Sequence, residues 1–279
     1  MADDYLNKAR QLLRQEAEAI LDLEKNINDN FSRAVDVLFH VTGKVIVAAV
    51  GKSGCVGRKI AATFASTGTP SFFMHGYEAG HGDIGALAPT DALLVISNSG
   101  ETEELITVVL AARKLSIPVI GLLGNERSTL AAKCDLVLGV GVRSEADPLN
   151  LVPTSSSTVA LAMGDALAIA LLTRRDFRPS DFAMAHPAGQ LGRRLLTTVQ
   201  DLMHTGDAIP FVHENSGIPD ALFTMTKKGL GVVGVLNDEE ELVGVITDGD
   251  LRRGLARAAD FMRLSSSEIM SRNPKWITA

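Results

Sequence analysis

Three hydroxyl side chains lie close together where a predicted strand meets a predicted helix. Ser97, Ser99 and Thr102 belong to the sequence SNSGET at 97–102, which follows an apolar run and precedes a helical segment. The start of a helix offers unpaired backbone N–H groups and the positive end of the helix dipole. An ordinary N-cap with a capping box would explain one hydroxyl. Three at one junction favour a binding site for an anion such as a phosphomonoester.

A lysine follows the first predicted strand. The sequence GKSG at 51–54 opens the first crossover helix, and it lacks the GxxxxGK[ST] spacing of a P-loop. Lys52 and its neighbour Ser53 are expected at the carboxyl edge of the sheet, where open α/β folds bind ligands. For a single lysine, a solvated loop side chain is the competing interpretation.

Four further ionisable side chains fall in predicted loops or first helical turns: Glu104, Glu145, His81 and His186. Taken singly, each has an ordinary explanation as a solvent-facing carboxylate, a cap or a structural donor. Isomerisation of an aldose to a ketose requires a base beside C1 and C2, an acid at the oxygens and a group that stabilises an enediolate. A carboxylate, a histidine and Lys52 around one phosphate site would supply those parts.

The elements that must position these residues alternate along the first two thirds of the chain. Short apolar runs predict strands at 45–50, 71–74, 92–97, 118–123 and 136–140. Helical segments are predicted between them at 57–66, 103–115 and 128–133, and elsewhere at 3–27, after Asn30, at 156–174 and at 189–198. The alternation predicts an α/β fold with a doubly wound, parallel five-stranded sheet.

A second, smaller unit begins near Leu202. Its pattern predicts a helix at 218–227, a strand at 232–236, a turn at Asn237-Asp238, a strand at 242–247 and a helix at 249–256, with residues 198–209 as the linker.

Composition excludes several classes of protein. The 279 residues carry a net charge of −6 with no basic stripe, so nucleic acid is not expected as a partner. The acidic N-terminus is not a signal peptide, and the most apolar stretch, 159–172, is too short to span a bilayer, so no membrane is expected. Two cysteines and the absence of HExxH or CxxC argue against a metal site, and we expect no cofactor and a cytoplasmic location.

Several ordered motifs resemble the D-arabinose 5-phosphate isomerase family. They are VGKSG, EAGHGDIG, ISNSGETEE, SEADPLNLVPTSSSTVALAMGDALA, HPAGQLGRRL and, nearer the C-terminus, ITDGDLRR. The resemblance implies a sugar isomerase (SIS) domain over 1–198 and a first cystathionine β-synthase (CBS) motif over 199–263. It implies interconversion of D-ribulose 5-phosphate and D-arabinose 5-phosphate through an enediol, for Kdo and lipopolysaccharide biosynthesis. It also implies a homotetramer with sites shared between subunits.

The same resemblance implies roles for particular residues. Ser97, Ser99 and Thr102 would grip the phosphate, with Ser53 and His81 also binding substrate. The implied catalytic residues are Lys52, Glu104, Glu145 and His186. The sequence departs from the family at Cys55, where His is frequent, at Asp147, where Cys is frequent, and in the HPAG sequence at 186–189, where HPGG is usual.

The C-terminal end suggests an incomplete repeat. Residues 264–279 look like the opening of a second CBS motif, with IMSRNP at 269–274 parallel to LMHT at 202–205. We therefore expect a truncated CBS segment and a natural chain longer by about 50 residues. Thr247 and Asp250 would contribute by family resemblance to an adenine-nucleotide site, which would be complete only in a CBS pair.

Two other functions remain as alternatives. One is another SIS-type isomerase, acting on a hexulose or heptose phosphate, and the other is a non-catalytic sugar-phosphate sensor. The CBS segment argues against the first, since short SIS enzymes lack one. The acid and base set argues against the second, because a sensor needs no acid/base pair.

Overall fold

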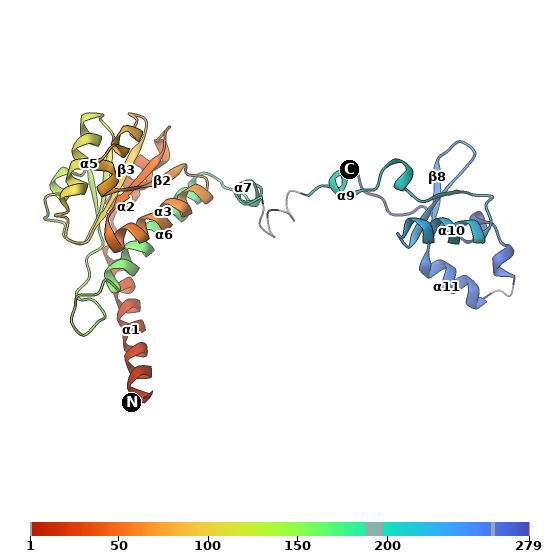
Figure 1. Ribbon diagram of the computed structural model, residues 1–279, viewed down its shortest axis with the longest axis horizontal. Helices are drawn as coiled ribbons and strands as arrows, with labels where there is room; N and C mark the ends of the chain where they lie inside the picture. Colours follow the sequence, from red (N-terminus) through yellow and green to blue (C-terminus); the bar gives the residue numbers. More distant parts are fainter. Residues whose placement is uncertain (1, 188–191, 193–196, 258–259, 279) are drawn as a thin grey trace. The chain divides into compact units, whose positions relative to one another are not determined.

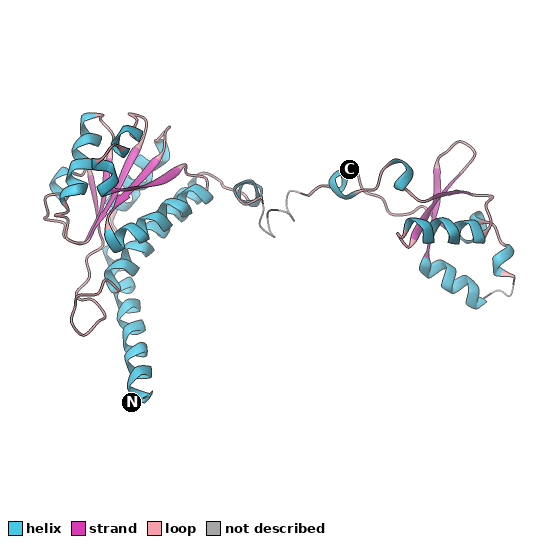
Figure 2. Ribbon diagram, in the orientation of Figure 1, coloured by secondary structure: helices cyan, strands magenta, loops and turns pink. Residues whose placement is uncertain are grey.

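The computed structural model describes residues 2–187, 192, 197–257 and 260–278, and the chain divides into two compact units. The first unit spans Met1–Leu196 and the second spans Thr197–Ala279. Each contains its own sheet (Figures 1 and 2). Each also has its own buried core.

The first unit is built on a five-stranded parallel sheet in the order β2-β1-β3-β4-β5. Its strands lie side by side as magenta arrows in Figure 2. The strands are β1 (Val45–Ala49), β2 (Ser71–His75), β3 (Ala92–Ser97), β4 (Val119–Leu123) and β5 (Leu136–Gly139). Every residue of β1, β3 and β4 is buried, as their continuous apolar runs predict. The predicted fold class is confirmed, and each predicted strand boundary lies within one residue of the observed one.

Helices cover both faces of this sheet (Figure 1). They are α1 (Ala2–Asn26), α2 (Asp29–His40), α3 (Gly51–Ser66), α4 (Gly76–Gly80), α5 (Glu103–Lys114), α6 (Ser155–Arg174) and α7 (Pro179–Ala185). Alternate strand residues face opposite sides, so Val47 packs with α2, α3 and α6 while Ile46 packs with α5. Each face therefore has its own apolar core.

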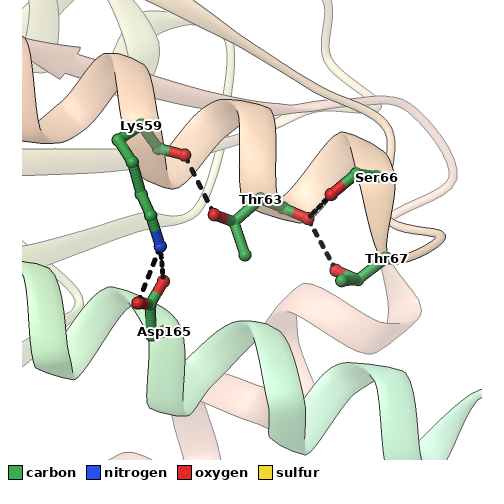
Figure 3. Close-up of polar contacts among 5 residues, drawn as sticks. All are labelled: Lys59, Thr63, Ser66, Thr67 and Asp165. Carbon is green, nitrogen blue, oxygen red and sulfur yellow. Dashed lines mark hydrogen bonds and ion pairs between the residues drawn. The ribbon is translucent and has the colours of Figure 1, made fainter. Parts of the chain in front are cut away.

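Helices α3 and α6 approach each other closely on one of these faces. Gly164 of α6 leaves room for Ile60 of α3, since a Cβ at Gly164 would lie 2.3 Å from Ile60 Cδ1. One residue further on, Asp165 accepts two hydrogen bonds from Lys59 Nζ, at 2.5 and 2.7 Å (Figure 3). Asp165, a charged residue within the apolar stretch 159–172, thus forms an ion pair at the edge of a helix contact.

Helix α6 is longer than the apolar stretch within it. By length and composition it could cross a membrane, and 44% of its most apolar window is buried inside the structure. Val159, Met163, Leu167 and Leu171 repeat at helical spacing and lie in the core beneath the sheet. This is the packing of a core helix. A core helix can have the same length and apolar composition as a membrane-spanning helix.

The sequence does not predict helices α4 and α7 of the first unit, and two of the predicted helices differ from the observed structure. Helix α3 begins at Gly51, which agrees with GKSG opening the crossover helix, whereas the predicted helical segment 57–66 begins six residues too late. Gly54 and Gly57 are not loop residues, because both sit against the ring of Phe73 on β2. The segment predicted as a helix at 128–133 contains only a 3₁₀ turn, Ala131–Lys133. The helix predicted at 189–198 lies mainly outside the described residues.

The second unit has a four-stranded sheet in the order β6-β7-β8-β9. Its elements are α9 (Val199–Leu202), β6 (Phe211–His213), α10 (Ile218–Lys228), β7 (Val232–Leu236), β8 (Leu242–Thr247), α11 (Asp248–Arg257), α12 (Ser266–Ile269) and β9 (Ser271–Arg272). The predicted helices and hairpin are present, but the predicted linker 198–209 includes α9 and a 3₁₀ turn at Gly206–Ala208. The strands β6 and β9 are too short for alternation to indicate them.

Candidate active site

The site lies where the chain changes direction across the sheet. Strands β1 and β3 are neighbours, but the chain leaves β1 for α3 on one face and leaves β3 for α5 on the other. In a sheet of this order the carboxyl ends of these two strands border a crevice that binds ligands. The predicted phosphate loop (residues 97–102) and Lys52 follow directly after these strands.

The phosphate loop is folded by its own hydroxyls. Ser97, only 4% exposed, accepts a hydrogen bond from Gly100 N at 3.0 Å, and its Oγ lies 3.1 Å from Thr102 Oγ1. Ser99 Oγ accepts from Glu101 N at 3.2 Å. Thr102 is the N-cap of α5, yet its side chain makes no capping hydrogen bond. The first-turn amides of α5 are therefore not capped by the side chain of Thr102, which argues against the ordinary capping box.

The loop after β4 supports the phosphate loop from outside. Gly100 has φ +71°, and a Cβ there would lie 2.0 Å from Ser128 Oγ, so close packing requires glycine. Leu130 N donates to Gly100 O at 3.0 Å, and Thr129 N donates to Glu101 Oε1 at 2.9 Å. Hydrogen bonds from Thr129 lower the pKa of Glu101. Glu101 thus points to the neighbouring loop.

Lys52 and Ser53 occupy the first turn of α3. Lys52 is exposed and makes no ion pair among the residues that the structure describes. A cation at the positive end of a helix is unfavourable by itself, and a bound anion would reverse this. No acidic residue lies in this turn to neutralise it.

A small cavity of about 60 Å³ joins three parts of this edge. It is lined by Ser53, Ile96, Ser97, Asn98, Leu122, Val140, Pro153, Ser156, Ser157 and Ala160. The first turn of α3, the end of β3 and the start of α6 therefore meet here. Sequence reasoning missed Asn98, Ser156 and Ser157; the run of three serines at 155–157 before an apolar helix was the available signal.

Glu104 and His81 lie on the elements that follow β3 and β2. Glu104 is an exposed residue in the first turn of α5. It stands against α4, because a Cβ at Gly76 would lie 3.4 Å from Glu104 Cβ. His81 is the exposed C-cap of α4, with its ring 4.7 Å from that of Tyr77. Both residues are therefore at the carboxyl edge.

Glu145 is tied to the N-terminus of α6. Its Oε2 accepts hydrogen bonds from Thr154 N at 2.9 Å, Thr154 Oγ1 at 3.2 Å and Ser156 N at 3.2 Å, and its Oε1 accepts one from Ser156 Oγ. Desolvation alone would raise the pKa of Glu145, but the hydrogen bonds from Ser156 and Thr154 outweigh it and lower the pKa. Glu145 is thus held as a carboxylate beside the cavity.

His186 does not join these residues within one chain. Helix α6 begins beside the cavity and ends at Arg174, and Arg175 then bonds to Thr69 and to Leu38 O, at the opposite edge of the sheet. Helix α7 follows from there, and His186 is its C-cap, stacked on Phe182 at 4.1 Å. The structure brings together the other predicted site residues of the first unit and leaves His186 apart.

Thr247 and Asp250 of the second unit bond to each other. Asp250 Oδ2 accepts from Thr247 N at 2.9 Å and Thr247 Oγ1 at 2.7 Å, and Arg253 donates to Asp250 Oδ1 at 2.6 Å. This is a capping interaction at the start of α11. Among the described residues no group of three His, Cys, Asp or Glu side chains could hold a metal ion.

The fold and the site define an SIS-domain protein with an appended CBS unit. The chain matches the SIS domain model over residues 38–170 and the CBS domain model over 199–257. It is 46% identical over 268 residues to arabinose 5-phosphate isomerase KdsD of Escherichia coli (strain K12), covering 96% of this chain and 82% of the relative. It is 46% identical over 276 residues to KdsD of Pseudomonas aeruginosa, and the alignment covers 99% of this chain and 85% of that relative.

A solved structure is also similar to this chain. It is a protein from E. coli CFT073 in complex with arabinose 5-phosphate, with 43% sequence identity and a TM-score of 0.65. The match covers 66% of this chain and 98% of that protein's chain. The chain belongs to the arabinose 5-phosphate isomerase family, as its motifs predict.

Proposed function

We propose that this protein interconverts D-ribulose 5-phosphate and D-arabinose 5-phosphate through an enediol. The observation that carries the proposal is the juxtaposition of the phosphate loop, Lys52 and Glu104 at the carboxyl ends of neighbouring strands. Family membership and the arabinose 5-phosphate complex of a 43% identical protein support the choice of substrate.

The reaction needs one carbon-bound proton to move between two carbons. A carboxylate removes a proton from C1 of the ketose while the C2 oxygen gains one, which gives the enediol. Returning a proton to C2 and releasing the O1 proton then gives the aldose. Lys52 would stabilise the negative charge of the enediolate, and Ser97, Ser99 and Thr102 with nearby amides would hold the 5-phosphate. Ser53 and His81 would contact the sugar.

Glu104 is the better of the two candidate bases. Both oxygens of Glu145 already accept hydrogen bonds, and these bonds lower its pKa, which weakens it as a base. Glu104 is exposed at the same edge and makes no side-chain hydrogen bond with another described residue. Glu145 would then organise the start of α6 and one wall of the pocket.

His186 would come from a neighbouring subunit of a homotetramer. Exposed apolar residues support assembly: Leu6, Leu13 and Ile20 on α1 are spaced seven apart and are 54%, 63% and 39% exposed. His186 would move the hydroxyl protons or open the sugar ring.

We further propose a cytoplasmic enzyme that feeds Kdo and lipopolysaccharide synthesis. An adenine nucleotide would bind only a complete CBS pair, where Thr247 and Asp250 would exchange their capping bonds for ligand contacts.

The purified protein, incubated with ribulose 5-phosphate in deuterium oxide, tests the proposal. We expect arabinose 5-phosphate carrying deuterium at C2. Glu104→Gln should lose turnover by about 100-fold or more, as expected for a general base, while the matched neighbour Glu103→Gln should not. Binding without deuterium exchange would indicate a sensor, and exchange only with a hexulose or heptose phosphate would indicate another SIS isomerase.

A further inference from the structure

The loop between β5 and α6 is organised by the side chain of Asp147. Its Oδ1 accepts a hydrogen bond from Leu149 N, and its Oδ2 accepts bonds from Leu151 N and Val152 N, each at 2.8 Å. Partial desolvation would raise the pKa of Asp147, but the amide bonds outweigh it and lower the pKa. One carboxylate therefore holds three backbone amides of a single turn.

Burial of apolar side chains does not stabilise this turn. Leu149 and Leu151 are each 74% exposed, and Val152 is 54% exposed. Apolar surface that stays in water contributes little to holding a conformation. The three bonds to the Asp147 carboxylate restrain residues 149–152 together with two bonds at Asn150: its amide donates to the backbone oxygen of Asp147 at 3.0 Å, and its Oδ1 accepts from Glu145 N at 2.6 Å. No packed core would replace the bonds to the carboxylate in its absence.

The turn leads directly into the candidate site. Pro153, the next residue, lines the cavity together with Ser53 and Ser97. Thr154 and Ser156 then supply the donors that bind Glu145, and Thr154 Oγ1 also accepts from Ala146 N at 2.8 Å, which joins the two ends of the loop. A change in the turn would therefore shift both Glu145 and the wall formed by Pro153.

We propose that Asp147 is a positioning residue that fixes Glu145 and Pro153 relative to Ser53 and Ser97. The proposal rests on the function proposed above for this site. The phosphate loop is supported separately, through Thr129 and Leu130 of the loop after β4. Loss of Asp147 should therefore misplace the reacting end of the sugar and leave the phosphate grip intact, so that kcat falls and KM hardly changes.

Three variants test the role. Asp147→Ala removes all three bonds, and we expect kcat to fall by about tenfold or more, with KM for ribulose 5-phosphate within about twofold. Asp147→Asn keeps one carbonyl oxygen, which can still accept from Leu151 and Val152, so its kcat should lie between those of wild type and Asp147→Ala. Asn237→Ala is the matched control, because Asn237 Oδ1 likewise accepts from the amides of Glu239 and Glu241, in the second unit; its kcat should be normal.

Hydrogen exchange measured without substrate separates this proposal from the proposed function. Asp147→Ala should speed exchange at the Thr154 and Ser156 amides, which donate to Glu145, but not at Leu130 N. Unchanged exchange at those two amides, or faster exchange with normal kcat, would overturn the positioning role. If wild-type protein does not isomerise the sugar, the proposed function fails, and exchange at Thr154 and Ser156 alone decides whether Asp147 positions Glu145. If Asp147→Ala does not fold, the same criteria apply to Asp147→Asn.

Discussion

The hydroxyl of Thr102 lies 3.1 Å from Ser97 Oγ and makes no hydrogen bond to the helix that Thr102 begins. An N-cap threonine ordinarily accepts from an amide two or three residues on. Here the hydroxyl is directed to the end of β3. Leu105 N donates to the backbone oxygen of Thr102 at 3.1 Å, and the amides of Glu103 and Glu104 are left for another acceptor. The arrangement makes sense if that acceptor is the phosphate of a substrate.

Removing this hydroxyl should weaken substrate binding. Thr102→Ala should raise KM for ribulose 5-phosphate by an amount equivalent to about 1–2 kcal/mol, because one donor to the anion is lost, with a smaller effect on kcat. Steady-state kinetics measure both. Thr107→Ala is the matched control: its hydroxyl donates to Glu103 O on the same helix, away from the loop. Equal KM values for the two variants would remove Thr102 from the phosphate site.

The carboxylate of Glu145 should make stability depend on pH. Hydrogen bonds in the folded protein lower its pKa below the ordinary value of 4.5. A group whose pKa is lowered on folding stabilises the fold above its unfolded pKa, and the stabilisation is lost as pH falls through the folded pKa. The melting temperature of Glu145→Gln should therefore lie below that of the wild type at neutral pH. The difference between the two melting temperatures should narrow as the pH drops below 4.5. Melting curves from neutral to acid pH test this, and a gap independent of pH would assign the loss to packing.

The sequence predicts the sheet well because burial and chain direction are both local signals. The strand β3, for example, is six apolar or small residues ending at Ser97, and all are buried. The same reasoning places Lys52, Ser97 and Glu104 at one edge, since residues that follow parallel strands share that edge. It could not show that both oxygens of Glu145 are bound by residues nine and eleven positions away, because loop conformation has no periodic signal.

It also could not place His186. That residue follows α6, whose length of 20 residues carries the chain about 30 Å from the cavity. Sequence motifs identify acid and base residues but do not give the distances between them. The predicted helical segment 57–66 begins six residues after the start of α3 for a related reason. Glycines at 54 and 57 suggest a loop, but they permit contact with Phe73, a partner that lies on the next strand.

The contact between α3 and α6 should depend on shape more than on charge. Lys59 and Asp165 are 49% and 40% exposed, so their ion pair should contribute less than about 1 kcal/mol. A side chain at Gly164 would instead meet Ile60 Cδ1 at 2.3 Å and Ile60 Cγ1 at 2.5 Å, so that Ile60 or one of the helices must shift. Gly164→Ala should cost about 1–3 kcal/mol, and Asp165→Asn less. Urea unfolding measures how much each substitution lowers the free energy of unfolding. A larger decrease for Asp165→Asn than for Gly164→Ala would contradict the prediction.

The separation of His186 from Lys52 within one chain predicts complementation between two inactive variants. If the site takes Lys52 from one subunit and His186 from its neighbour, a mixed pair of Lys52→Ala and His186→Ala subunits contains one site with both substitutions and one site with neither. Co-expression in equal amounts makes about half of the random pairs mixed, so about a quarter of the wild-type activity should return. Each variant alone should be nearly inactive. The matched control combines Lys52→Ala with Glu104→Gln: both residues lie at the same edge of one chain, so every site in a mixed pair carries one of the two substitutions and no activity should return. Recovery in the first mixture and none in the second would assign His186 to the neighbouring subunit. No recovery in either would require α7 to bring His186 back to the site of its own chain.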